Sequence, residues 1–253
     1  MRAKLSMVVL FISCMFSVGL ANELESKMHS ANLLVATEKY SEAITAYQEI
    51  LATDHYSSEL YYNLGICYYQ QKDMGMAILN FKRALKFDPS FDAARENIET
   101  IKSEQVNTIY EVEPFFLTVF WKNLSNTFSP TVWGVISLLI FASLIYLVYL
   151  FLFNERNYPT NRLKAGMLGL VFFFVISFAA GNQRLSVLNS NKHAIVLEAS
   201  SRYAGPDEKS VIDQDLIPEG TEVIILEELS GWYKVSLPDL DHVWMKPDMF
   251  ELI

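Results

Sequence analysis

Cysteine is scarce in this sequence, which contains Cys14 and Cys67 and no other cysteine. Cys14 lies in an N-terminal segment that we expect to be removed, so Cys67 would have no partner within the mature chain. A framework of intrachain disulfides is therefore excluded. Histidine is also sparse, and its four occurrences are scattered without the spacing of a metal site. The sequence predicts no bound metal and no cofactor.

The chain also lacks an excess of basic residues. Lysine and arginine together number 20 against 29 acidic residues, which gives a formal net charge of −9. Proteins that bind nucleic acid normally present a basic footprint that neutralises the phosphates. The charge balance therefore argues against a nucleic-acid partner, although it identifies no other partner.

Signatures of catalysis are absent as well. The sequence has no glycine-rich phosphate loop and no GxSxG or HExxH motif. Cys67 is the one candidate nucleophile of the mature chain, but it precedes Tyr68 inside a predicted helix, where small packing residues are normal. We interpret it as a structural thiol and predict that the protein is not an enzyme.

Two long apolar runs are present in the middle of the chain. Val132–Phe153 and Ala165–Gly181 contain no charged residue, and at about 1.5 Å per residue they reach about 33 Å and about 25 Å. The first is long enough to span a bilayer core. The alternative is a pair of buried helices in a soluble protein, but the length of the first run favours a membrane. We predict transmembrane helices over residues 131–153 and 165–184, joined by a turn over 154–164.

The polar groups within these spans are serine and tyrosine, which suggest no ion path and argue against a transporter. Small residues in the pairs Gly134/Ser137 and Ala165/Gly169 would let the two helices pack closely.

Residues 1–21 have the pattern of a secretory signal peptide. Arg2 and Lys4 precede an apolar run, and Gly19 and Ala21 are the small residues that a signal peptidase requires. A lipoprotein signal that uses Cys14 and an uncleaved anchor are the alternatives. Each of the three places the following segment on the outer side of the membrane.

Two spans then return the chain to the same outer side. The intervening turn would be cytoplasmic, and it contains Arg156, Arg162 and Lys164, as the positive-inside rule requires. We therefore expect a bacterial inner-membrane protein whose two polar segments are periplasmic.

Residues 22–105 are helical in pattern and repeat with a period of 34, as the alignment of Ala43 with Ala77 shows. The second copy has eight positions of the tetratricopeptide repeat (TPR) pattern: Tyr61, Leu64, Gly65, Tyr68, Ala77, Phe81, Ala84 and Pro89. The first copy is degenerate, with Ala31 in place of the glycine and His55 in place of the proline. Phe91–Gln105 has the pattern of a closing helix. We predict an all-α TPR domain.

The TPR resemblance implies a binding groove along the first helix of each repeat. On the second repeat its positions are Glu59, Tyr62, Ile66, Tyr69 and Gln70. Tyr62 and Tyr69 lie seven residues apart and share a helical face, which is typical of a recognition surface. The alternative is that both tyrosines pack against neighbouring helices.

Residues 106–130 are rich in aromatic side chains and directly precede the first span. Aromatic rings are favoured at the membrane–water interface, so we interpret this segment as an interfacial linker. A helix packed against the TPR domain is the alternative.

The last segment, residues 189–253, has short strand-like runs punctuated by turns such as Pro218-Glu-Gly220 and Ser230-Gly231. With Gly231-Trp-Tyr-Lys-Val235 and Val243-Trp-Met245, it resembles a bacterial SH3 (SH3b) domain, although Val243 stands where that family usually has glycine. The resemblance implies a small all-β barrel. Trp232 and Lys234 share one face of their strand, and Trp232 matches the family's peptide-facing aromatic residue, although it could simply close the barrel.

The order of signal peptide, TPR pair, membrane hairpin and SH3b-like segment resembles the BatE-like family of the Bacteroides aerotolerance (Bat) system. The resemblance implies a multidomain membrane protein, a non-enzymatic scaffold or adaptor whose protein-interaction modules lie in the periplasm. It also implies partners among von Willebrand factor A-domain membrane proteins and a role in stress tolerance. A cell-wall-associated module that binds peptidoglycan through the SH3b-like segment is the alternative.

Overall fold

The computed structural model describes residues 23–105, 109, 112–153, 160–190, 192–212 and 216–253. The predicted signal peptide, residues 1–21, lies outside them. The described chain divides into two compact units. Residues up to 109 form the first unit together with residues 192–253, and residues 112–190 form the second.

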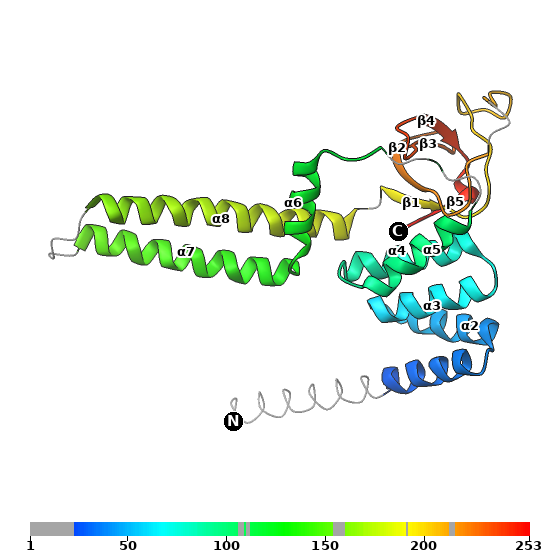
Figure 1. Ribbon diagram of the computed structural model, residues 1–253, viewed down its shortest axis with the longest axis horizontal. Helices are drawn as coiled ribbons and strands as arrows, with labels where there is room; N and C mark the ends of the chain where they lie inside the picture. The colour runs from blue at the N-terminus through cyan, green and yellow to red at the C-terminus, as the bar shows by residue number, and fades with distance from the viewer. Residues whose placement is uncertain (1–22, 106–108, 110–111, 154–159, 191, 213–215) are drawn as a thin grey trace, which may run out of the picture. The chain divides into compact units, whose positions relative to one another are not determined.

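The first unit begins with antiparallel helices that match the TPR prediction (Figure 1). Helical residues 23–36 are followed by α2 (Tyr40–Leu51), α3 (Ser58–Gln70), α4 (Met74–Phe87) and α5 (Asp92–Glu104). The Ser57 and Asp73 side chains accept hydrogen bonds from the backbone N–H groups of Leu60 and Met76, and so cap α3 and α4. These caps fix where the two helices of the second repeat begin.

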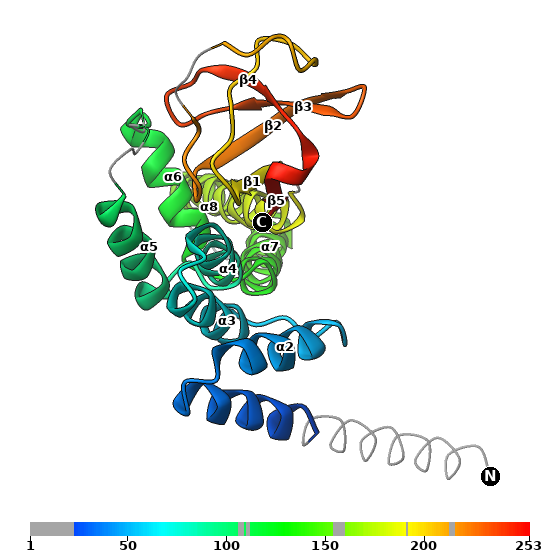
Figure 2. The ribbon, with the colours of Figure 1, turned by 90° about the vertical axis from the view of Figure 1, so that its right-hand side faces the viewer.

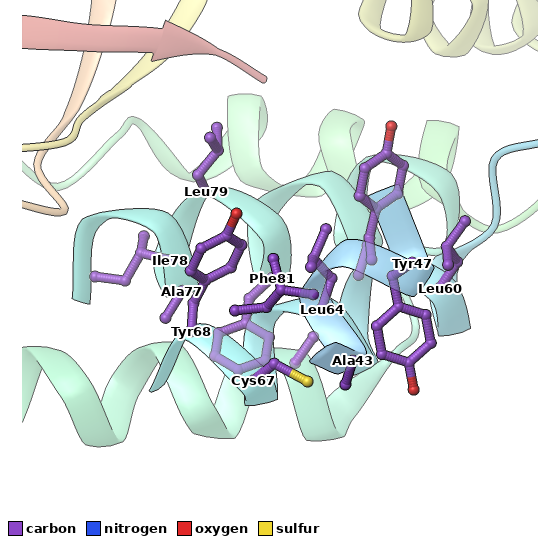
Figure 3. Packing of buried hydrophobic residues seen from close by; sticks show 14 of the residues in the cluster. Ala43, Tyr47, Leu60, Leu64, Cys67, Tyr68, Ala77, Ile78, Leu79 and Phe81 are labelled. Carbon is purple, nitrogen blue, oxygen red and sulfur yellow. The ribbon is translucent and has the colours of Figure 1, made fainter. Parts of the chain in front are cut away.

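The repeat signature explains the packing of α3 against α4. A Cβ on Gly65 would lie 2.7 Å from the Phe81 ring, so only glycine lets that ring approach α3. Ala43, Ala77 and Phe81 are fully buried in the same helical core. Figure 3 shows these side chains with Tyr47 and Cys67 between the helices.

The C-terminal segment of the first unit forms a small antiparallel sheet. Its strands are β1 (His193–Val196), β2 (Glu222–Leu229), β3 (Trp232–Ser236), β4 (His242–Met245) and β5 (Phe250–Leu252), and the short 3-10 helix η1 (Pro247–Met249) precedes β5. Their order in the sheet is β4-β3-β2-β1-β5. The β2–β3 hairpin closes through Ser230 and Gly231, both with positive φ, as its tight turn requires.

The two faces of this sheet contribute to different cores. Ala194 and Val196 on β1 point into a cluster with Val223, Val235 and Met245, which is the core of the C-terminal segment. Ile195, between them, is also fully buried but belongs to the core of the helices. Because side chains alternate along a strand, β1 is shared between the two cores.

The second unit contains α6 (Phe116–Asn126), α7 (Pro130–Phe153) and α8 (Thr160–Asn189). Two of its helices, Pro130–Phe153 and Asn161–Asn189, are long and apolar enough to cross a membrane. The turn predicted over residues 154–164 is shorter than expected, because α8 already begins at Thr160, and residues 154–159 lie outside the described part. The second predicted span, 165–184, is part of a longer helix.

The α7–α8 hairpin is antiparallel and close-packed (Figure 1). Ser137 Oγ and Ser177 Oγ are 2.9 Å apart, and the Phe141 and Phe174 rings pack with centroids 5.8 Å apart. A Cβ on Gly181 would lie 3.0 Å from the Trp133 Cβ. Of the predicted packing pairs, Ser137 lies in this interface.

Gly134 and Gly169 do not mediate the hairpin contact. A Cβ at either position would have no neighbouring heavy atom within 4 Å. The expectation that these two glycines bring the helices together was wrong, because neither is at a point of close approach between the helices.

Candidate interaction surfaces

The helices and the sheet of the first unit are joined along α4, β1 and β5, as both ribbon views show (Figures 1 and 2). Leu197 and Ile253 pack against the helical core beside the buried Ile195. The approach is tight at Gly75, where a Cβ would lie 2.4 Å from the Leu197 carbonyl oxygen. Gly75 is therefore required by the contact with the sheet and not by the repeat itself.

A second glycine stands on the sheet side of the same interface. Gly220 has φ of +77°, and a Cβ there would lie 2.3 Å from the Ile78 Cδ1 atom. The Gln105 amide nitrogen donates to the neighbouring Glu219 carbonyl oxygen at 3.0 Å. Glu219 and Gly220 thus fit directly against α4 and the residue that follows α5.

A carboxylate on β2 links the sheet to α4. The Lys82 ammonium donates to Glu222 Oε2 at 2.5 Å, and His193 Nδ1 lies 2.9 Å from Glu222 Oε1. Because an ionised carboxylate only accepts, Nδ1 of His193 carries the proton. Burial raises the pKa of the Glu222 carboxyl, but the His193 hydrogen bond and the Lys82 charge outweigh it, and the net pKa lies well below its usual range.

Two basic residues that follow Lys82 on α4 hold the last strand. Arg83 donates to Glu251 Oε1 at 2.7 Å and to the Leu252 carbonyl oxygen at 2.6 Å, and Lys86 donates to the Ile253 carbonyl oxygen at 2.8 Å. Burial, followed by the Arg83 charge, lowers the pKa of Lys86. The interface is therefore apolar at its centre and bounded by charge-assisted hydrogen bonds.

This interface was not foreseen from the sequence, which suggested two separate modules. The signals that could have located it are weak. They are a glycine at the second position of α4 and a strand, β1, that is buried on both faces. Neither signal identifies the partner surface.

The predicted TPR groove residues lie on α3 but differ in exposure. Glu59 and Gln70 are exposed, whereas Tyr62, Ile66 and Tyr69 are partly buried. Tyr69 has the Lys72 ammonium 5.6 Å above its ring. The structure therefore leaves at least the two polar positions open to a partner.

Tyr62 is mainly a packing residue. Its ring centroid lies 5.6 Å from that of Phe81 and 5.0 Å from that of Phe91, and its hydroxyl accepts a hydrogen bond from Asn97 at 3.3 Å. These contacts agree with the alternative given for Tyr62, in which it packs against neighbouring helices and does not face a partner.

Amides along the first helices of the repeats were missed in the sequence. Asn63 and Asn97 lie 34 residues apart, at equivalent positions of successive repeats. Asn63 donates to the Asn32 side-chain oxygen at 3.1 Å, and Tyr47 donates to the same oxygen at 2.6 Å. The repeat spacing of the two asparagines would have marked them as members of one face.

Cys67 is fully buried between the helices, and burial raises the pKa of its thiol to about 11. The thiol is therefore protonated near neutral pH, which is the state of a structural cysteine. Within the described ranges, no group of three or more His, Cys, Asp or Glu side chains is arranged to hold a metal ion.

Trp232 and Lys234 lie on the face of β3 opposite to its core side, where Val235 is buried and Tyr233 packs against Phe250. The Trp232 ring meets that of Tyr203 edge-on, with centroids 4.9 Å apart. Lys246 lies 5.6 Å from the Trp232 centroid and forms an ion pair with Glu208 at 2.6 Å. An aromatic pair and a cation therefore lie together around Trp232.

The tetratricopeptide repeat family matches residues 58–91 of the chain, which are α3, α4 and the turn that follows them. No curated protein matches the chain. The family match concerns one repeat, and such repeats generally mediate protein–protein interactions.

Proposed function

We propose that the protein is a non-enzymatic, membrane-anchored scaffold that presents a protein-binding surface outside a bacterial inner membrane. The observation that supports it most directly is the position of the internal interface. The sheet uses the second helix of the matched repeat, α4, and leaves Glu59 and Gln70 on the first helix exposed. At least these two positions of the surface that TPR domains use for partners are thus open to a partner.

The packing of the first unit supports the topology of this proposal. The helices precede the apolar hairpin in the chain and the sheet follows it, yet they share a core that includes Ile195. Two segments that share one core must lie on the same side of a membrane. An even number of spans meets that requirement, and the expected signal peptide makes the shared side periplasmic.

The finer assignment follows the Bat-like resemblance. In this proposal the sheet is an SH3b-like barrel, and the partners are membrane proteins with von Willebrand factor A domains that act in stress tolerance. The aromatic pair of Tyr203 and Trp232 would form a second contact surface on the sheet.

The test is crosslinking in native membranes followed by mass-spectrometric identification of the partners. Glu59→Lys and Tyr69→Ala, alone and combined, should reduce recovery of a specific partner at least about tenfold if each change removes 1.4 kcal/mol or more of binding. Glu49→Lys, at an exposed position of the second helix α2, is the matched control and should leave recovery unchanged. Equal recovery from all variants would refute the proposal for the α3 surface.

Peptidoglycan binding is the second candidate, favoured by the Trp232, Tyr203 and Lys246 cluster. The full chain in detergent, incubated with purified sacculi, should sediment with them, and Trp232→Ala should abolish sedimentation. No binding by the wild type would exclude this candidate, and binding that survives Trp232→Ala would exclude the Trp232 cluster as its site. Either result would leave the scaffold proposal open.

A further inference from the structure

Helix α6 has an apolar surface that the second unit does not cover. Phe116 and Phe120, one helical turn apart, are 67% and 64% exposed, and Leu117 beside them is 53% exposed. Lys122 and Thr118 lie on the opposite side of the helix and are also exposed. α6 is therefore amphipathic and has more exposed apolar surface than an aqueous helix normally shows.

The position of α6 within its unit is defined by contacts with the hairpin. The Trp133 indole nitrogen donates to the Ser125 carbonyl oxygen at 3.1 Å. The Phe128 ring packs edge-on against the Trp133 ring, with centroids 5.3 Å apart. The short connection Thr127–Ser129 leads directly into α7, and Ser129 Oγ accepts from the Val132 N–H at 3.3 Å. The end of α6 is thus fixed to the first turn of α7.

The first turn of α7 lies beside the point on α8 where apolar residues give way to polar ones. Trp133 lies against Gly181, and the uninterrupted apolar run of α8 ends there, because Asn182, Gln183 and Arg184 follow. In both ribbon views α6 runs across the hairpin and not along it (Figures 1 and 2). α6 therefore crosses at the level where the lipid-compatible surface gives way to polar residues.

We infer that α6 is a membrane-surface helix that lies in the headgroup region with Phe116, Leu117 and Phe120 inserted among the acyl chains. The occupant of the exposed apolar face is the outer leaflet of the bilayer, because the end of α6 is fixed to the start of α7, where Val132 and Val135 are also apolar and exposed. Lys122 and Thr118 then face water. The inference rests on the proposed membrane hairpin and adds a second membrane contact to it.

The test uses the full chain reconstituted in phosphatidylcholine–phosphatidylglycerol vesicles, with a nitroxide label on one added cysteine at a time. Positions 116 and 120 report on the apolar face, and 118 and 122 on the opposite face of the same helix. Leu139, 63% exposed in the middle of α7, is the bilayer-core reference. The wild-type chain, carried through the same labelling, gives the background from its own cysteines.

Collision with oxygen and with a water-soluble nickel chelate measures the depth of each label. We expect label 139 deep in lipid, labels 116 and 120 shielded from nickel at a shallower depth, and labels 118 and 122 accessible to nickel. Nickel access at 120 equal to that at 122, with 139 still in lipid, would overturn the inference alone. Nickel access at 139 would overturn the hairpin and this inference together.

A second copy of the chain is the competing occupant. It would cause spin–spin broadening at positions 116 and 120 that disappears when the labelled protein is diluted with unlabelled protein. Broadening of that kind would replace the lipid contact with a protein contact and refute the inference.

Discussion

Gly75 shows how a single residue can be determined by a distant segment of the chain. In an isolated repeat, alanine would be the better helix former at this position by about 1 kcal/mol. Here the Cβ of any other residue would approach the backbone of Leu197. The sign of the effect of substitution therefore depends on whether the sheet contacts α4.

Gly75→Ala should destabilise the first unit by about 1–3 kcal/mol, because overpacking against backbone forces a shift. The measurement is the thermal or urea unfolding of the full chain in detergent, followed by circular dichroism. Gly169→Ala, at a helical glycine with open space around it, is the control and should leave stability unchanged or raise it by up to about 1 kcal/mol. A stabilising effect of Gly75→Ala would show that the interface does not form in solution.

Glu222 gives the interface a pH dependence. Its folded-state pKa is depressed, so the stability that it contributes is complete above its unfolded value, about 4.5, and is lost as the pH falls below that value. Glu222→Gln should cost about 1.5–3 kcal/mol at pH 7, the usual range for hydrogen bonds to a charged group.

Unfolding free energies of wild type and Glu222→Gln, measured from pH 7 to pH 3, should converge as the pH falls below about 4.5. Glu227→Gln, an exposed glutamate on the same strand, should track the wild type throughout. A constant difference between wild type and Glu222→Gln would mean that the ion pair with Lys82 contributes no stability.

Among the elements, the packing of α7 against α8 depends more on one close contact between the helices than on the number of glycines in them. Gly181 lies against Trp133, whereas Gly169 on the same helix faces open space. Gly181→Leu should therefore weaken the hairpin and Gly169→Leu should not. The readout is SDS-induced unfolding in mixed micelles, followed by circular dichroism. Equal midpoints for the two variants would contradict the observed packing.

The elements that were predicted well are those with local signatures. The repeat of α3 and α4 was visible because eight of its positions are fixed by helix–helix packing within 34 residues. The hairpin was visible because a bilayer requires an uninterrupted apolar run, whatever the rest of the chain does. Both signatures are contained in residues that are close together in the sequence.

The contact of β1 with α4 could not be predicted in the same way. Ile195 and Ile78 are separated by more than a hundred residues, and nothing in a run such as His-Ala-Ile-Val indicates which helix will cover its second face. The groove assignment was incomplete for a related reason. The burial of Tyr62 depends on Phe91 in the next repeat, whose exact placement the sequence does not give.

For the chain as a whole, the shared core makes a prediction about topology. Cysteines introduced at Tyr56 and Leu240, both exposed in the first unit, should react with a membrane-impermeant maleimide from the same side of sealed vesicles. A cysteine at Asn161, at the beginning of α8, should react from the other side. Labelling of positions 56 and 240 from opposite sides would be incompatible with the common core.

The participation of α4 in two interfaces also limits how the protein can be divided. A fragment that ends after α5 would expose Ile78 and leave Lys82 and Arg83 without Glu222 and Glu251. A fragment that begins at β1 would expose Ile195 to water. A phenotype obtained by deleting either segment would therefore report damage to both, and separation of their roles requires point substitutions in the intact chain.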